Sequence, residues 1–202
     1  MSYRIAIVYF SGAGHTARVA EHVRRGAAAQ DARATVELFP VTDFPDAETG
    51  PWDRLLAADA IIFGSPTYMG AVAAAMKAFM DATAGIWYTG AWTDKLAAGF
   101  ANSGSPAGDK LATLQQFSVF AAQHAMTWVN FGAKPEFAAS TADYKTSVNR
   151  TGHFLGLGTH SANDLPAEET PDAIELETAE RFGARVARIT GVYVAGRAAV
   201  AA

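Results

Sequence analysis

Hydrophobic and polar positions divide the chain into two kinds of segment that alternate. Short runs rich in apolar residues predict strands, and the most apolar of them predict strands buried on both faces of a sheet; these runs lie at residues 5–10, 35–39, 60–64, 96–101 and 125–129. Longer segments predict helices, at residues 15–29, 52–58, 71–83, 109–124 and 171–190. Strands that alternate with helices form parallel sheets through right-handed crossovers. We therefore predict an α/β fold, a doubly wound five-stranded parallel sheet with helices on both faces.

Two segments fall outside this alternation, and we expect them to be long loops, at residues 85–95 and 130–168. The sequence has no internal repeat and no linker that separates two halves. A length of 202 residues suits one folded unit. We predict a single domain that spans residues 1–202.

Composition narrows the possible chemistry. The absence of cysteine excludes disulfides, thiolate nucleophiles, iron–sulfur clusters and Cys-ligated zinc, so redox chemistry needs a bound cofactor. A formal net charge of −4 without a basic stretch argues against nucleic-acid binding. The histidines form no metal-binding pair of the H-E-x-x-H type, and we predict no metal site. No apolar run reaches 18 residues and no signal peptide precedes the first strand, so we expect no membrane span and a cytoplasmic protein.

Three segments follow predicted strands and are rich in small and hydroxyl residues: residues 11–16, 65–70 and 102–109, the first, second and third loop. In a doubly wound sheet, ligands bind beyond the carboxyl ends of the strands. We therefore expect the three loops to form one binding site at that edge.

The first loop joins a buried strand directly to the start of a helix. Free backbone N–H groups and the helix dipole favour an anion there, and Gly12 and Gly14 let the backbone approach it closely. Ser11 and Thr16 add hydroxyl donors. The loop contains no lysine and matches neither G-x-x-x-x-G-K-[ST] nor G-x-G-x-x-G, which favours a monophosphate over a nucleoside triphosphate with Mg²⁺. The alternative is that Ser11 and Thr16 only cap the helix.

Four separated motifs carry a family resemblance: residues 9–16 (YFSGAGHT), 64–70 (GSPTYMG), 85–92 (GIWYTGAW) and 102–104 (NSG). The later residues His124-Ala125-Met126 continue the match in order. Over residues 3–130 the chain resembles the flavodoxin-like FMN-dependent NAD(P)H:quinone oxidoreductases once described as tryptophan-repressor-binding proteins. Asn149-Arg150 and Gly156-Leu157-Gly158 resemble flavodoxin-family reductases more loosely.

The resemblance implies a role for each matching residue. The FMN phosphate would be held by Ser11, Gly12, Ala13, Gly14, His15 and Thr16. The isoalloxazine ring would be lined by Pro66, Thr67, Tyr68, Met69 and Gly70, and its pyrimidine edge or the ribityl chain approached by Asn102, Ser103 and Gly104. Trp87 would close the flavin site of a neighbouring subunit, and His124, the candidate catalytic residue, would lie near the flavin face. The third loop departs from the family, since it has Ser105-Pro106-Ala107-Gly108 where threonine and glycines are usual.

Three of these residues also have a simpler interpretation. His124 ends a predicted helix, where a histidine can complement the helix dipole. Trp87 can belong to the core of a long loop, and Tyr68 can be an amphipathic surface residue. The sequence leaves these alternatives open.

The function that follows is transfer of two electrons from NAD(P)H, through FMN, to a quinone or similar acceptor. Both substrates would use the flavin in turn, with ping-pong kinetics and no essential protein acid or base. The resemblance also implies a homodimer or homotetramer. The alternatives are a flavodoxin-type electron carrier and an FMN-binding regulatory protein without turnover. A net charge of only −4 is weak for a carrier that docks through a charged face, which favours the enzyme.

Overall fold

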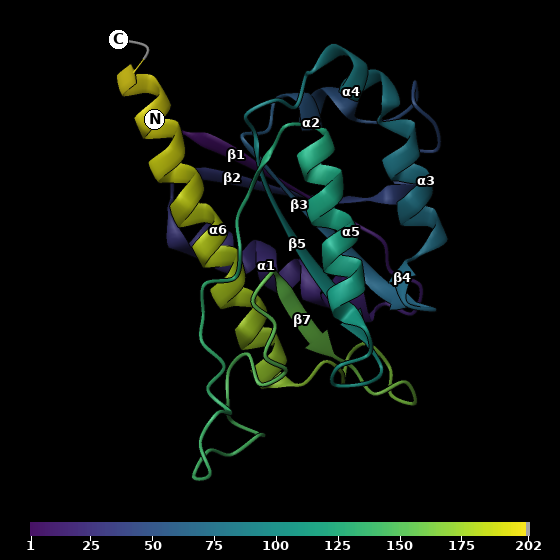
Figure 1. The fold of residues 1–202 in the computed structure, drawn as a ribbon, viewed down its shortest axis with the longest axis vertical. Helices are drawn as coiled ribbons and strands as arrows, with labels where there is room; N and C mark the ends of the chain where they lie inside the picture. Colours follow the sequence, from purple (N-terminus) through teal and green to yellow (C-terminus); the bar gives the residue numbers. More distant parts are fainter. Residues whose placement is uncertain (201–202) are drawn as a thin grey trace.

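The computed structural model describes residues 1–200 and has a parallel sheet at its centre, with the strand order β2-β1-β3-β5-β6 (Figure 1). The order reverses between β1 and β3, which places a ligand crevice at the carboxyl ends of these strands. The sheet confirms the predicted five parallel strand positions. Its strands are β1 (Tyr3–Tyr9), β2 (Ala34–Pro40), β3 (Ala60–Tyr68), β4 (Ala71–Val72), β5 (Leu96–Ser103), β6 (Thr127–Trp128) and β7 (Leu157–His160).

Helices cover both faces of the sheet, as predicted. Side chains along β1 alternate between the two sides: Ile5 and Ile7 join the core under α1 and α6, while Ala6 and Val8 join the core under α2, α3 and α5. The helices are α1 (His15–Gln30), α2 (Trp52–Leu56), α3 (Ala74–Ala82), α4 (Ala84–Thr89), α5 (Lys110–Gln123) and α6 (Ala173–Val200), with a 3-10 turn η1 (Val41–Asp43).

The helices α1 and α6 cross at close range because two glycines face each other's backbone. A Cβ at Gly26 would collide with the backbone of Glu180, and a Cβ at Gly183 would collide with the backbone of Val23. The long helix α6 runs along most of the molecule in Figure 1. Within residues 1–200, no helix combines the length and the apolar character needed to cross a membrane.

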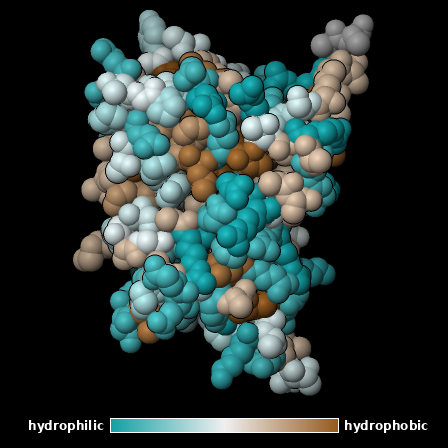
Figure 2. All heavy atoms as spheres, turned by 180° about the vertical axis from the view of Figure 1, so that it is seen from behind, coloured by the Kyte–Doolittle hydropathy of each residue, from teal (hydrophilic) through white to brown (hydrophobic). Residues whose placement is uncertain are grey.

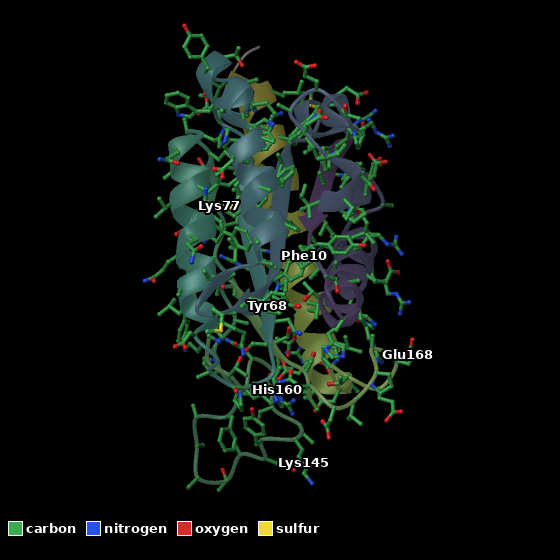
Figure 3. All side chains as sticks on the ribbon, turned by 90° about the vertical axis from the view of Figure 1, so that its right-hand side faces the viewer. Phe10, Tyr68, Lys77, Lys145, His160 and Glu168 are labelled. Carbon is green, nitrogen blue, oxygen red and sulfur yellow. The ribbon has the colours of Figure 1, made fainter. Side chains whose placement is uncertain are left out.

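The fifth strand position differs from the prediction, because two short strands share it. β6 pairs with Leu96 and Ala97 at the start of β5, and β7 pairs with β5 from Phe100 to Ser103. The segment between them, the insertion (residues 129–156), extends beyond the body of the molecule at Lys145 (Figure 3). Thus the predicted strand 125–129 is only two residues long, and the expected loop 130–168 contains a strand. A four-residue strand that includes a glycine carries too little periodicity to be predicted on its own.

The segment after β3 also differs from the prediction. The expected helix 71–83 starts at Ala74, because β4 first turns back against β3 through Met69 and Gly70. Both turn residues have positive φ, 49° and 79°, as a two-residue hairpin turn with the correct twist requires. The expected loop 85–95 contains α4, and the last helix continues ten residues past the predicted end at 190. Seen from behind, the surface shows hydrophobic side chains in its middle with hydrophilic ones around them (Figure 2).

Candidate functional site

The three loops meet at the carboxyl ends of β1, β3 and β5 and enclose a cavity of about 240 Å³. Figure 3 shows Tyr68 and His160, from the second loop and from β7, toward this end of the molecule. Only Asn163 among the lining residues was not predicted. The cavity is lined by Gly12, Ala13, His15, Thr16, Pro66, Thr67, Tyr68, Asn102, Ser103, Gly104 and Asn163.

The first loop leaves hydrogen-bonding groups unused at the start of α1. Gly14 is the N-cap residue, with φ of 84°, and within residues 1–200 no side chain caps the helix. Ser11 Oγ is buried and has no hydrogen-bond partner in this part of the chain. The structure therefore does not support the alternative in which Ser11 and Thr16 serve as caps. Uncapped N–H groups and an orphaned hydroxyl are what a bound anion would satisfy.

The second loop is held from behind by hydroxyl groups. Ser65 Oγ accepts a hydrogen bond from the backbone N–H of Ala73 at 3.0 Å and donates to the carbonyl of Pro66 at 2.8 Å. Thr67 Oγ1 and Thr113 Oγ1 on α5 lie 2.8 Å apart. Met69, predicted to line the ring together with Gly70, lies at the tip of the hairpin with its side chain fully exposed.

The third loop presents one amide group to the cavity. Asn102 is buried, and its Oδ1 accepts hydrogen bonds from Thr159 Oγ1 at 2.9 Å and from Ser161 Oγ at 3.0 Å. Within residues 1–200 its Nδ2 donates no hydrogen bond. The two N–H groups of Asn102 are thus available for a carbonyl oxygen of a ligand.

A fourth segment, the strap (residues 161–171), lies over the first loop. His15 Nε2 donates to the carbonyl of Leu165 at 2.9 Å, and Arg18 donates to the carbonyl of Ala167 at 2.5 Å. Asn163 packs directly against Gly104, where a side chain on residue 104 would collide with it. No local pattern marks the strap, because its contacts with the first and third loops join residues that are distant in sequence.

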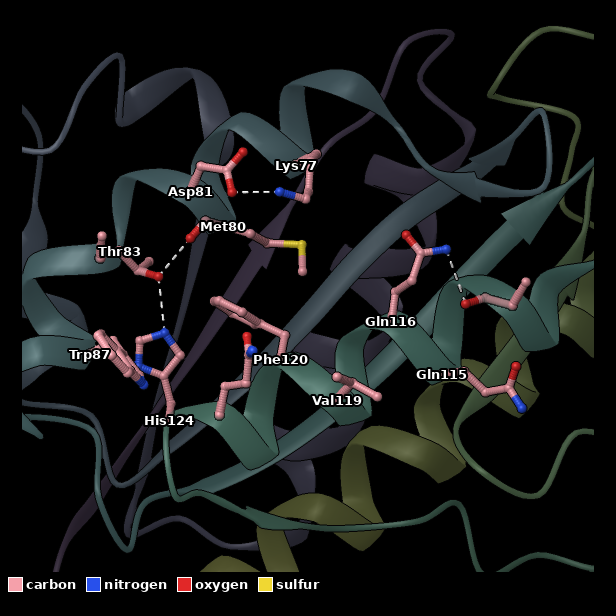
Figure 4. A pocket seen from close by; sticks show the side chains of 13 residues that line it. Lys77, Met80, Asp81, Thr83, Trp87, Gln115, Gln116, Val119, Phe120 and His124 are labelled. Carbon is pink, nitrogen blue, oxygen red and sulfur yellow. Dashed lines mark hydrogen bonds and ion pairs between the residues drawn. The ribbon is translucent and has the colours of Figure 1, made fainter.

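The structure does not bring Trp87 and His124 to these loops. Both line a second hollow of about 730 Å³ between α3, α4 and α5, the outer groove (Figure 4). α5 begins beside the third loop and ends immediately before His124, and its 14 residues span about 21 Å. In this chain the candidate catalytic histidine therefore lies far from the cavity.

His124 is packed as a neutral side chain. Thr83 Oγ1 donates to the carbonyl of Met80 at 2.7 Å, so it accepts from His124 Nε2, which lies 2.9 Å away. The imidazole ring lies 4.7 Å from the ring of Trp92 and 4.8 Å from that of Phe120. Burial lowers the pKa of His124. A neutral imidazole gives little to the helix dipole, so the structure favours packing over that alternative.

The donor set suits FMN better than a metal or a nucleotide triphosphate. The residues that line the cavity include no Asp, Glu, Lys or Arg, while backbone N–H groups, hydroxyls and amides are plentiful. Such donors match a phosphate monoester and a ring with several carbonyl groups. In residues 1–200 no three His, Asp or Glu side chains gather into a metal site.

Comparison with known proteins finds similar sequences and structures among flavodoxins and quinone oxidoreductases. Residues 4–138 match the family model described as NADPH-dependent FMN reductase. The chain is 41% identical over 186 residues to flavodoxin FldP of Pseudomonas aeruginosa, covering 92% of this chain and 96% of that protein. It is 30% identical over 204 residues to an NAD(P)H dehydrogenase (quinone) of Rhizobium rhizogenes, covering 95% and 99%. A solved structure, the flavodoxin, WrbA-like protein from Agrobacterium tumefaciens, is 34% identical with a TM-score of 0.71, covering 95% and 99%.

Proposed function

The chain belongs to the NADPH-dependent FMN reductase family, and we propose that it is an FMN-dependent oxidoreductase that passes two electrons from NAD(P)H to a quinone or a similar small acceptor. The observation that carries the proposal is the first loop, where the start of α1 is uncapped and Ser11 Oγ is buried without a partner, beside a cavity that two further loops line with neutral donors. FMN, when bound, supplies hydride acceptance and donation.

The protein's own part is to bind and to orient. The first loop would hold the phosphate through residues 11–16, and Asn102, whose Oδ1 is already engaged, would offer its Nδ2 to the ring. Tyr68 of the second loop would line the ring site, and the strap is fixed over the first loop by its bonds to His15 and Arg18. The lining contains no carboxylate, and its one histidine, His15, donates from Nε2 to the carbonyl of Leu165, which agrees with a reaction that needs no protein acid or base.

Self-association completes this proposal. Trp87 is 57% exposed and Val119 is 61% exposed along the outer groove, which is a large apolar area for one chain to leave in water. In a homodimer or homotetramer, the exposed Trp87 would reach the flavin site of a neighbouring copy, a place that it cannot reach in its own, whereas His124 lies buried beneath this surface. The setting of this activity is the cytoplasm, and a chain without cysteine needs no oxidising compartment.

The test is anaerobic reduction of the FMN-loaded protein by NADPH and by NADH. The visible flavin absorbance should bleach with a nicotinamide and return when benzoquinone is added. In steady state, double-reciprocal plots at several benzoquinone concentrations should be parallel, as expected when both substrates use the flavin in turn. Intersecting lines would contradict the shared site, and failure to bind FMN would contradict the proposal as a whole.

One observation favours an alternative, a flavodoxin-type electron carrier: the relative with 41% identity is named a flavodoxin. A carrier would keep its flavin oxidised with NADPH and NADH but would be reduced by dithionite or by a reductase partner. The same anaerobic titration therefore separates the two functions. Bleaching by a nicotinamide alone supports the enzyme.

A further inference from the structure

A buried lysine lies behind the third loop and has no part in the function proposed above. Lys110, the first residue of α5, is fully buried. Its Nζ donates to Ser103 Oγ at 2.9 Å and to the carbonyl of Ser105 at 2.7 Å. Ser103 lines the cavity, so the ammonium group is separated from the cavity by one layer of protein.

No carboxylate of residues 1–200 pairs with this ammonium group. The nearby buried acid, Glu175 of α6, instead pairs with Arg150, whose Nε lies 2.8 Å from Glu175 Oε1. Arg150 also pairs with Asp172 at 2.8 Å. Because each of these acids is already engaged with Arg150, the charge of Lys110 has no contact counter-ion in the protein.

A buried charge of this kind is costly unless a ligand compensates it. Burial lowers the pKa of Lys110 to about 8, which shows the cost and still leaves the ammonium form dominant at pH 7. A hydride from NAD(P)H brings two electrons and one proton, so the flavin ring gains one negative charge unless a second proton follows. In the proposed site the third loop would line the ring, so the charge of Lys110, which lies behind that loop, would act on the ring through it.

We propose that Lys110 is a positioning residue that tunes the flavin: its uncompensated charge, acting through the third loop, favours reduced FMN over oxidised FMN. The inference rests on the proposed function, because it requires FMN in the cavity. It assigns to Lys110 two separable tasks. The hydrogen bonds to Ser103 and Ser105 shape the loop, and the charge raises the potential of the bound flavin.

The chain provides a matched control in Lys95. Lys95 Nζ likewise donates to two carbonyls, those of Leu56 at 2.7 Å and Ala58 at 2.6 Å, and burial lowers its pKa. It precedes β5, whereas Ser103 ends that eight-residue strand, about 26 Å away. A substitution at Lys95 therefore removes a similar lysine without changing the charge beside the cavity.

The experiment measures the two-electron potential of bound FMN at pH 7, against a reference dye, together with the affinity for oxidised FMN. Lys110→Gln keeps a side chain that can donate to the third loop but removes the charge, and Lys110→Met removes both. Both variants should lower the potential, with the preference for reduced over oxidised FMN falling about tenfold. Lys110→Arg and Lys95→Met should keep the wild-type potential. Lys110→Gln provides the same measurement if Lys110→Met does not fold.

The pH profile gives a second measurement that a purely structural role would not change. As the pH rises from 7 to 9, the difference between the flavin potentials of the wild type and Lys110→Gln should become smaller, because Lys110 loses its charge. The other groups that face Lys110 are Glu175 of α6, His153 of the insertion and His160 of β7. Burial lowers the pKa of both histidines, and the pair with Arg150 opposes the rise that burial causes in the pKa of Glu175, so we assign the change between pH 7 and 9 to Lys110.

The outcomes separate this inference from the proposed function. FMN-loaded Lys110→Gln with the wild-type potential at every pH would overturn the tuning role, even if its affinity for FMN fell. A wild-type protein that binds no FMN would overturn the proposed function and this inference with it. A lowered potential in Lys110→Gln but not in Lys95→Met would support the inference, whichever acceptor the enzyme uses.

Discussion

The hydroxyl of Tyr68 lies over the backbone of Gly12, so close that a Cβ on residue 12 would stand 2.5 Å from it. This contact joins the first loop to the second, and it exists only because residue 12 has no side chain. The Tyr68 side chain is half exposed, so it can move aside without disturbing the core.

Gly12→Ala should therefore weaken FMN binding while leaving the fold intact. Displacing Tyr68 removes an aromatic contact with the ring, and we expect about a tenfold loss of FMN affinity, measured by quenching of flavin fluorescence. Gly196→Ala is the control, because nothing lies within 4 Å of a Cβ at that position. Equal affinities in the two variants would show that Tyr68 does not contact the flavin.

Ser11→Ala should separate binding from stability. Ser11 Oγ is buried without a partner within residues 1–200, so its removal should leave the FMN-free protein as stable as before or slightly more stable. FMN affinity should fall about tenfold with the loss of one hydrogen bond to the phosphate. Thermal melts with and without FMN measure both effects. Ser118→Ala, which removes a hydroxyl from the exposed side of α5, should change neither.

Val119→Glu should weaken self-association. The substitution places a charge in the outer groove, where Val119 is 61% exposed in the single chain. Sedimentation velocity should show a smaller species, and quinone turnover should fall with it because Trp87 no longer reaches a neighbouring site. Val192→Glu introduces the same charge at an equally exposed position on α6 and should leave the oligomer unchanged. A monomeric wild-type protein would contradict the proposed assembly.

Glu175→Gln should strongly destabilise the protein. Both partners of the Arg150–Glu175 pair are almost fully buried, and loss of the carboxylate leaves the charge of Arg150 with only the exposed Asp172. We expect the free energy of unfolding in urea to fall by about 3 kcal/mol. Glu177→Gln breaks an exposed pair with Arg181 and should cost less than about 1 kcal/mol. Similar losses in both variants would mean that the buried pair is solvated.

His153 should make stability depend on pH. Burial and the nearby charge of Lys110 lower its pKa to about 4 in the folded state, from the ordinary value of 6.5. Between these values the unfolded chain binds a proton that the folded chain does not, so stability is complete above pH 6.5 and falls toward pH 4, by roughly 3 kcal/mol. Urea unfolding across this range should show a flatter dependence for His153→Leu than for the wild type. Parallel curves would exclude His153 as the cause.

Much of the fold could be predicted from the sequence because its elements carry local signals. The strand at residues 60–64 and the small-residue loops both follow from a few consecutive residues. β7 could not be predicted, because Leu157–His160 becomes a strand only by pairing with Phe100 to Ser103, more than fifty residues earlier. The predicted strand at 125–129 is shorter in the structure, because β6 pairs only with the start of β5 and β7 pairs with its end.

The site residues also fall into those that a local sequence pattern predicts and those that only the tertiary structure brings to the cavity. Gly12, Ala13, His15 and Thr16 could be placed at the cavity, because a strand that leads directly into a helix puts the free N–H groups of the helix start at the carboxyl edge of the sheet. Asn163 was missed, because it reaches the cavity through the strap and not through a motif. The distance of Trp87 and His124 from the cavity depends on the direction and length of α5, which a motif match does not convey.

The packing of α1 against α6 sets the order in which a growing chain can acquire its cofactor. The phosphate loop leaves the ribosome early, but Val23 of α1 is covered by Gly183 of α6, near the other end of the chain. Asn102 is held by Thr159 and Ser161, which are also synthesised late. The complete site can therefore assemble only after residues 159–161 and α6 have been synthesised.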